Sequence, residues 1–218
     1  MLTKELISNS IPYLRKGDKV YQALQLMNDY HVAHLPIVEE ERYVGIISEE
    51  QLLHSDDDNK LEELSISNGG TSVQANDHFL KAIQVAVQNK LSVVPVIEND
   101  QLLGIVTYND LLRNASDFMS LDRPGALIVL EMESSAYSFT EINRIVESND
   151  AQITQLNTHP DPETGLTQVT IRISKLEVSN IISTFERYEY SIKYYFGEEL
   201  YENELRSNYD NLMHFLNI

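Results

Sequence analysis

Cysteine is absent from the 218 residues of the chain. Without thiols there is no disulfide framework, no cysteine nucleophile and no structural zinc site of the thiolate kind. A chain of this composition fits a reducing compartment, so we expect a cytoplasmic protein.

Basic residues are scarce, with 16 lysines and arginines against 34 aspartates and glutamates, and the formal net charge is −18. The acidic excess is spread along the chain and does not form one acidic tail. Such a charge repels duplex nucleic acid and anionic membrane surfaces. We therefore expect neither nucleic acid nor a membrane as a partner.

Long apolar runs are also missing. The longest, at residues 126–130, suits a buried strand and falls far short of the roughly 18 apolar residues of a membrane span. The first eight residues have no long apolar core and no small-residue cleavage site, so they do not predict a signal peptide. The expectation is a soluble protein.

Motifs of catalysis and of metal binding are not found. The chain has no Walker loop, no nucleophile elbow and no dinucleotide fingerprint. The three aspartates at 56–58 lack the glycine and distal glutamate of a calcium loop and fit a solvated linker. None of the six histidines has metal-ligand spacing, and His31 and His34 are expected at an exposed helix end and loop. We predict no enzyme, no required cofactor and no metal site.

The chain does contain an internal duplication. The spacing from Pro36 to Gly45 recurs from Pro95 to Gly104, at an offset of 59 residues (95 minus 36, and 104 minus 45). The same offset aligns chemically similar residues: Asp18 with Asp77, Ala23 with Ala82, Leu24 with Ile83, Leu35 with Val94, Ile37 with Val96, and Ile46 with Ile105. This register predicts two copies of one structural unit.

Each copy predicts the order β-α-β-β-α. A short first strand near residues 11–14 or 72–74 precedes a helix with apolar residues at i, i+3, i+4 and i+7. A strand with a central proline, a polar turn and a strand broken by glycine follow. A second helix opens after Ser48 in one copy and after Thr107 in the other.

The proline strand and the turn from Gly104 to Asp110, of the form G-h-h-[ST]-x-x-D, resemble the CBS-domain pattern. The resemblance covers about residues 1–117, with repeats at about 1–55 and 60–117 in a pair at 1–118. It implies a compact module with pseudo-two-fold symmetry and two clefts. It also implies an adenosyl ligand such as AMP, ADP, ATP or S-adenosylmethionine.

The motif is complete only in the second copy. By resemblance, Asp110 accepts hydrogen bonds from the ribose hydroxyls and Thr107 donates one to phosphate, which suits an acceptor-only carboxylate at a helix amino terminus. The resemblance places the adenine against an apolar group: Val73, Val94, Pro95 and Val96. In the first copy Ser48 keeps the hydroxyl, but Gln51 has a neutral amide in place of the aspartate. Ser48 and Gln51 therefore predict a weaker second site.

Two alternatives apply to these residues. Ser or Thr followed three residues later by an acid or amide is also a helix capping box, which both copies satisfy without any ligand. The apolar group is equally well explained as ordinary core. If a ligand does bind, the net charge of −18 favours a monophosphate or an uncharged or cationic adenosyl compound over ATP.

The second half predicts β-α-β-β-α-β, the ferredoxin-like order. Strands are expected at 126–132, 152–157, 166–173 and 191–196, helices over 139–146 and 178–185, and a loop at 159–165. The overall fold class is therefore α+β. Residues 119–197 resemble an ACT-like domain, and residues 198–218 predict an amphipathic helix.

ACT domains often bind amino acids at a dimer interface and usually carry an Asp-x-Pro-Gly turn after the first strand. Here residues 134–138 read Ser-Ser-Ala-Tyr-Ser, so a dimerisation role is the better expectation. A CBS pair followed by an ACT-like domain is similar to the acetoin-utilisation B-type proteins. Together these patterns predict a non-catalytic regulatory sensor of an adenosyl nucleotide, a homodimer that acts on an unknown regulated protein. The alternative is a structural or adaptor dimerisation protein with no small ligand.

Overall fold

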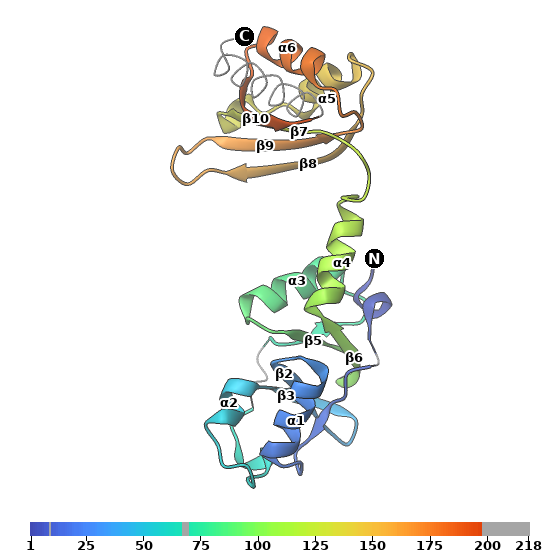
Figure 1. The fold of residues 1–218 in the computed structure, drawn as a ribbon, viewed down its shortest axis with the longest axis vertical. Helices are drawn as coiled ribbons and strands as arrows, with labels where there is room; N and C mark the ends of the chain where they lie inside the picture. The colour runs from blue at the N-terminus through green and yellow to red at the C-terminus, as the bar shows by residue number, and fades with distance from the viewer. Residues whose placement is uncertain (9, 67–69, 198–218) are drawn as a thin grey trace, which may run out of the picture. The chain divides into compact units, whose positions relative to one another are not determined.

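The structure is a computed structural model that describes residues 1–8, 10–66 and 70–197. It divides the chain into two compact units, Met1–Phe118 and a second that begins at Met119 (Figure 1). The helix predicted at 198–218 lies outside the described residues. Within the described ranges, no helix combines the length and the apolar composition needed to cross a membrane.

The first unit contains both copies of the predicted order β-α-β-β-α. The first copy follows a short 3₁₀ helix, η1 (Thr3–Leu6), and comprises β1 (Leu14–Arg15), α1 (Val20–Tyr30), β2 (His34–Glu39), β3 (Arg42–Ser48) and α2 (Glu49–Leu53). A second 3₁₀ helix, η2 (Leu61–Glu63), leads to β4 (Val73–Gln74), α3 (Phe79–Gln88), β5 (Val93–Glu98), β6 (Gln101–Thr107) and α4 (Tyr108–Phe118). The predicted repeat is therefore confirmed as a fold.

The strand order of this unit is symmetric, β1-β2-β3-β6-β5-β4. In each copy the first strand pairs in parallel with the second, which pairs in antiparallel with the third. The two halves meet where Arg42 of β3 pairs with Gln101 of β6. This palindromic order is what a pseudo-two-fold axis between the copies produces.

The two prolines are compatible with inner strands because the first strands are short. Each first strand has two residues, and they pair only with the residues after the proline, Ile37 and Val38 in one copy and Val96 and Ile97 in the other. No first-strand residue therefore faces Pro36 or Pro95, so the missing N–H removes no ladder bond on that side.

Both β-hairpins of the pair turn through two residues with positive φ. Glu40 and Glu41 have φ values of 48° and 70°, and Asn99 and Asp100 have values of 51° and 65°. Two consecutive left-handed residues characterise the type I′ hairpin turn, which favours Asn, Asp and Gly. The first hairpin thus places two glutamates where the second has residues suited to the turn.

The second unit has the predicted ferredoxin-like order. Its elements are β7 (Leu127–Met132), the 3₁₀ helix η3 (Ser134–Ala136), α5 (Phe139–Glu147), β8 (Ile153–Pro160), β9 (Thr167–Ile173), α6 (Ser179–Arg187) and β10 (Ser191–Phe196). The sheet has the order β10-β7-β9-β8 and is antiparallel throughout. Both α5 and α6 lie on the same face of this sheet (Figure 1), where Ile142, Ile145, Ile181 and Phe185 join the buried core.

The prediction of a loop at residues 159–165 is wrong at its start. Strand β8 continues through His159, which pairs with Gln168, and Pro160, which pairs with Thr167. Since β8 is an edge strand of the described sheet, a proline at its last position leaves no ladder partner unsatisfied on the outer side.

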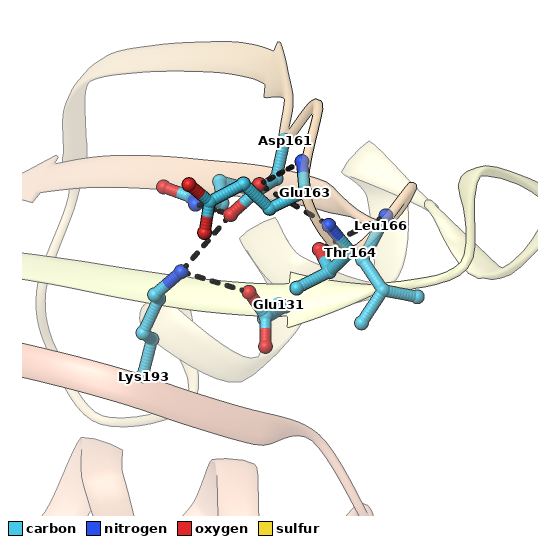
Figure 2. A network of polar contacts seen from close by, with 7 residues as sticks. Glu131, Asp161, Glu163, Thr164, Leu166 and Lys193 are labelled. Atoms are coloured by element: carbon cyan, nitrogen blue, oxygen red, sulfur yellow. Dashed lines mark hydrogen bonds and ion pairs between the residues drawn. The ribbon is translucent and has the colours of Figure 1, made fainter.

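The loop that follows β8 is fastened to the sheet by a polar network (Figure 2). The ammonium group of Lys193 on β10 lies 2.9 Å from a carboxylate oxygen of Glu131 and 3.2 Å from one of Asp161. The amide of Gln168 also donates to Asp161 at 2.6 Å. Hydrogen bonds from the Glu163 backbone, then from Lys193, lower the pKa of Asp161 to about 2. One loop carboxylate is thereby connected to both β9 and β10.

Candidate functional site

The predicted site pair of the second copy lies where β6 ends and α4 begins. Thr107 donates to Oδ2 of Asp110 from its backbone nitrogen at 3.2 Å and from its hydroxyl at 2.6 Å. The backbone nitrogen of Asp110 donates back to the Thr107 hydroxyl oxygen at 3.0 Å. Both residues are half-buried, and Oδ1 of Asp110 takes no part in these bonds.

The first copy repeats this geometry with an amide. Ser48 donates to Oε1 of Gln51 from its backbone nitrogen at 3.0 Å and from its hydroxyl at 3.1 Å, and the Gln51 nitrogen donates to the Ser48 hydroxyl at 3.2 Å. The Gln51 amide also donates to the carbonyl of Ser65 at 3.3 Å. Both turns are therefore complete capping boxes, and they differ in charge and in exposure, since Gln51 is exposed.

The four apolar residues predicted at the site lie in the core. Val73 pairs with Val96 between β4 and β5, and Pro95 pairs with Ile105 of β6. Val94 and Val96 have no exposed surface and Val73 is 3% exposed. In this structure these side chains are buried core residues and form no open surface.

A cavity of about 250 Å³ lies beside the motif of the first copy. Its wall combines residues of both copies: His34, Ile46, Ser48, Gln51, Thr71, Asn89 and Leu91. The motif turn of one copy thus shares a cavity with segments that flank β4 and β5 of the other. The cavity is lined mainly by neutral hydrogen-bonding groups.

A wider groove of about 490 Å³ lies along β6 of the second copy. From β6 it is lined by Leu102, Leu103, Gly104 and Ile105, and from the first copy by Ser8, Ile11, Pro12, Tyr13, Arg15 and Asp18. The backbone nitrogen of Ser8 donates to the Ile105 carbonyl at 2.8 Å and holds Ser8 against β6. Thr107 and Asp110 follow this strand but do not line the groove.

His34 is the residue whose environment differs most from expectation. The prediction of an exposed loop is wrong, because His34 opens β2 and is half-buried. Its Nδ1 accepts the backbone N–H of Ser92 at 3.2 Å, and burial lowers the pKa of its imidazole. The repeat register indicates that His34 is buried, because it aligns His34 with Val93 (34 plus 59), an apolar core position.

Comparison with known proteins identifies a family model and several relatives. A model of the family described as CBS domain matches residues 4–58 and 71–117. The protein YlbB of Bacillus subtilis is 28% identical over 116 residues, which span 50% of this chain and 78% of YlbB. An inosine-5′-monophosphate dehydrogenase of Methanocaldococcus jannaschii is 23% identical over 128 residues, which span 57% of this chain but only 26% of the enzyme.

Solved structures include a CBS domain pair/ACT domain protein from Thermotoga maritima, 21% identical with a TM-score of 0.49, covering 54% of this chain and 98% of that one. An acetoin utilization protein from Vibrio cholerae is 22% identical with a TM-score of 0.49, covering 56% and 95%. Each match spans about half of this chain. The family model identifies residues 4–58 and 71–117 as a pair of CBS domains.

Proposed function

We propose that this chain is a non-catalytic regulatory protein whose CBS pair binds an adenosyl nucleotide at the turn formed by Thr107 and Asp110. The observation that carries the proposal is the half-buried hydroxyl and carboxylate held together at the first turn of α4. In the first copy the same position has an amide. Of the two motif turns, only the second therefore carries the acceptor-only group that a ribose diol requires.

The capping box explains how a ligand enters without undoing the turn. The Thr107 hydroxyl accepts from the Asp110 nitrogen and donates its one hydrogen to Oδ2. A phosphate beside Thr107 would take that hydrogen, and Oδ2 would then accept from a ribose hydroxyl in its place. The bond from the Asp110 nitrogen remains, so α4 keeps its cap. Positive partial charge at the start of α4 favours the phosphate.

The proposed site has an apolar wall and a preferred ligand charge. Val73, Val94, Pro95 and Val96 are the proposed apolar contacts of the base, and because they are buried, a base would reach them only after a local rearrangement. A net charge of −18 disfavours a triphosphate in the absence of a metal. We therefore propose AMP, or an uncharged or cationic adenosyl compound such as S-adenosylmethionine, before ADP or ATP, with Ser48 and Gln51 as a weaker second site.

We further propose that the second unit is an ACT-like dimerisation domain and that the protein is a cytoplasmic homodimer that controls another protein. Support comes from its ferredoxin-like order and from β10, an edge strand of the described sheet. Tyr194 and Phe196 on this strand are 46% and 59% exposed. Exposed aromatic side chains on a sheet edge are suited to association.

The competing function is an adaptor that binds no small molecule. It is favoured by the closed capping box of Ser48 and Gln51, which forms without the nucleotide motif's aspartate. In that case Thr107 and Asp110 only begin a helix.

Thermal denaturation with AMP, ADP, ATP and S-adenosylmethionine separates the two functions. A ligand at 100 times its Kd should stabilise the folded protein by about 2.7 kcal/mol. The sensor predicts a raised midpoint that is lost in Asp110→Ala and kept in the matched variant Gln51→Ala. If none of the four compounds moves the midpoint of the unaltered protein, the adaptor function is supported and the sensor fails.

A further inference from the structure

The two copies are joined at their pseudo-two-fold axis by a small cluster of hydrogen bonds, which we name the crossing: Ala33, His34 and Ser92. The Ala33 nitrogen donates to the Ser92 hydroxyl oxygen at 3.0 Å. The Ser92 nitrogen donates to Nδ1 of His34 at 3.2 Å, and the Ser92 hydroxyl lies 3.2 Å from the same nitrogen. Ala33 and Ser92 are equivalent positions of the two copies (33 plus 59 is 92).

The crossing is bonded to both motif turns. The nitrogen of Glu49, the first residue of α2, donates to the Ala33 carbonyl at 2.9 Å. The nitrogen of Tyr108, the first residue of α4, donates to the Ser92 carbonyl at 3.2 Å. A continuous hydrogen-bonded path therefore runs from the turn of Ser48, through Ala33 and Ser92, to the turn of Thr107.

Of the three residues of the crossing, His34 is the one whose side chain can titrate near neutral pH. His34 faces the non-ionisable side chains of Ser48 on β3, Gln51 on α2, and Asn89 and Ser92, and Lys90 between the last two is exposed. Thr71 closes the cavity, and its hydroxyl lies 2.8 Å from the hydroxyl of Tyr43, whose pKa burial raises to about 12. The carboxylates of Glu49 and Glu50 on α2 are exposed. Among the described residues that line the cavity, His34 is the group that changes charge.

Protonation of His34 is incompatible with the observed bond from Ser92. An imidazole nitrogen accepts a backbone N–H only while it carries no proton, and in the imidazolium form both ring nitrogens are donors. A proton on Nδ1 would set two donors against each other and leave the Ser92 N–H without its acceptor. The Ser92 peptide must then shift or the ring must turn away. Movement of Ser92 displaces the carbonyl to which the first turn of α4 is bonded, whereas a turn of the ring alone leaves that carbonyl in place.

We propose that protonation of His34 is transmitted through Ser92 to the first turn of α4, so that the Thr107 and Asp110 site responds to pH. The crossing would make nucleotide affinity fall as the solution becomes acidic. The statement about affinity rests on the proposed function, whereas the movement of the turn does not. Because Val93 stands in the place of His34 in the second copy, the titrating group of the crossing comes from the first copy.

Amide and imidazole NMR spectra of the ligand-free protein test the transmission. His34→Asn is the matched variant, because its Oδ1 can accept the Ser92 N–H near the position of Nδ1 and does not titrate. Between about pH 7.5 and 5, the Tyr108 and Asp110 amide signals should follow the His34 titration, and they should stay still in the variant. An untitrated His34, an unmoved Tyr108 amide or equal movement in both proteins overturns the proposal. If His34→Asn does not fold, His34→Gln replaces it.

Calorimetric titration with AMP at about pH 7.5 and 5.5 tests the effect on affinity. The AMP phosphate itself takes up a proton near pH 6, and the variant corrects for this because it meets the same ligand. We expect the affinity of the unaltered protein to fall roughly fivefold more than that of His34→Asn. Equal ratios in the two proteins overturn the proposal. Failure of AMP to bind either protein at both pH values overturns the proposed function instead, and the amide titration then decides the transmission alone.

Discussion

Thr107 and Ser48 occupy the same position in the two copies, and each hydroxyl accepts the nitrogen of the residue three places later. Replacing either by alanine removes one helix cap, which costs about 1 kcal/mol of unfolding free energy. Thr107→Ala and Ser48→Ala should therefore lower stability in urea denaturation by similar amounts. Thr107→Ala should weaken AMP binding in calorimetry much more than Ser48→Ala does, because Ser48 belongs to the weaker proposed site. Equal losses of AMP affinity would contradict the assignment of the site to the second copy.

His34 predicts a pH dependence of stability. Burial lowers its pKa from 6.5, so as the pH falls the unfolded chain takes up the proton before the folded one. The stability that the neutral imidazole contributes is complete above pH 6.5 and is lost as the pH falls from there to the lower folded value. Relative to His34→Asn, the unaltered protein should lose unfolding free energy over that window. A constant difference in urea denaturation from about pH 7.5 to 5 would show that His34 is not linked to folding.

At the scale of elements, the hairpin between β2 and β3 stores strain that the equivalent hairpin avoids. Glu40 and Glu41 adopt left-handed φ values that favour Asn and Gly. The double change Glu40→Asn and Glu41→Gly should raise the free energy of unfolding by about 1 kcal/mol. The matched change Asp100→Gly in the second hairpin should give less, because Asn99 and Asp100 already suit the turn. Urea denaturation of the two variants measures the difference, and an equal or larger gain from Asp100→Gly would contradict it.

The loop between β8 and β9 depends on one carboxylate. Asp161 has its pKa lowered from 3.8 to about 2, first by the Glu163 nitrogen and then by Lys193, so its contribution is present above pH 3.8 and lost as the pH falls towards 2. Asp161→Asn should lower the thermal midpoint at neutral pH, and the deficit should shrink between about pH 4 and 2. Glu163→Gln removes a charge from the same loop and should leave the midpoint nearly unchanged. Equal midpoints for the two variants would show that the network contributes no stability.

At the scale of the whole molecule, the order of elements was predictable and the contacts between copies were not. Apolar periodicity and the 59-residue register predict each helix and strand because local burial decides them. The contact of His34 with Ser92 depends on how two copies pack about their axis, which no local pattern encodes. The local pattern predicts an exposed His34, although the repeat register aligns it with the buried Val93, and the sequence does not distinguish a capping role from a binding role at Thr107 and Asp110.

The end of β8 shows a second limit of prediction. Proline within a strand pattern indicates a loop unless the strand is known to lie at an edge. Sheet order, and with it the edge position of β8, follows from the pairing of distant segments. Position in the sheet thus decides whether Pro160 ends a strand or begins a loop.

The proposed function requires that the CBS pair hold an adenosyl nucleotide at Asp110. Calorimetric titration of AMP into the unaltered protein and into Asp110→Asn tests it most directly, because asparagine keeps the size and the capping ability of the side chain while it removes the carboxylate. We expect AMP to bind the unaltered protein and to lose about tenfold or more in affinity for the variant, as for a hydrogen bond to a charged group. No measurable heat with the unaltered protein, or the same Kd for both proteins, would contradict it.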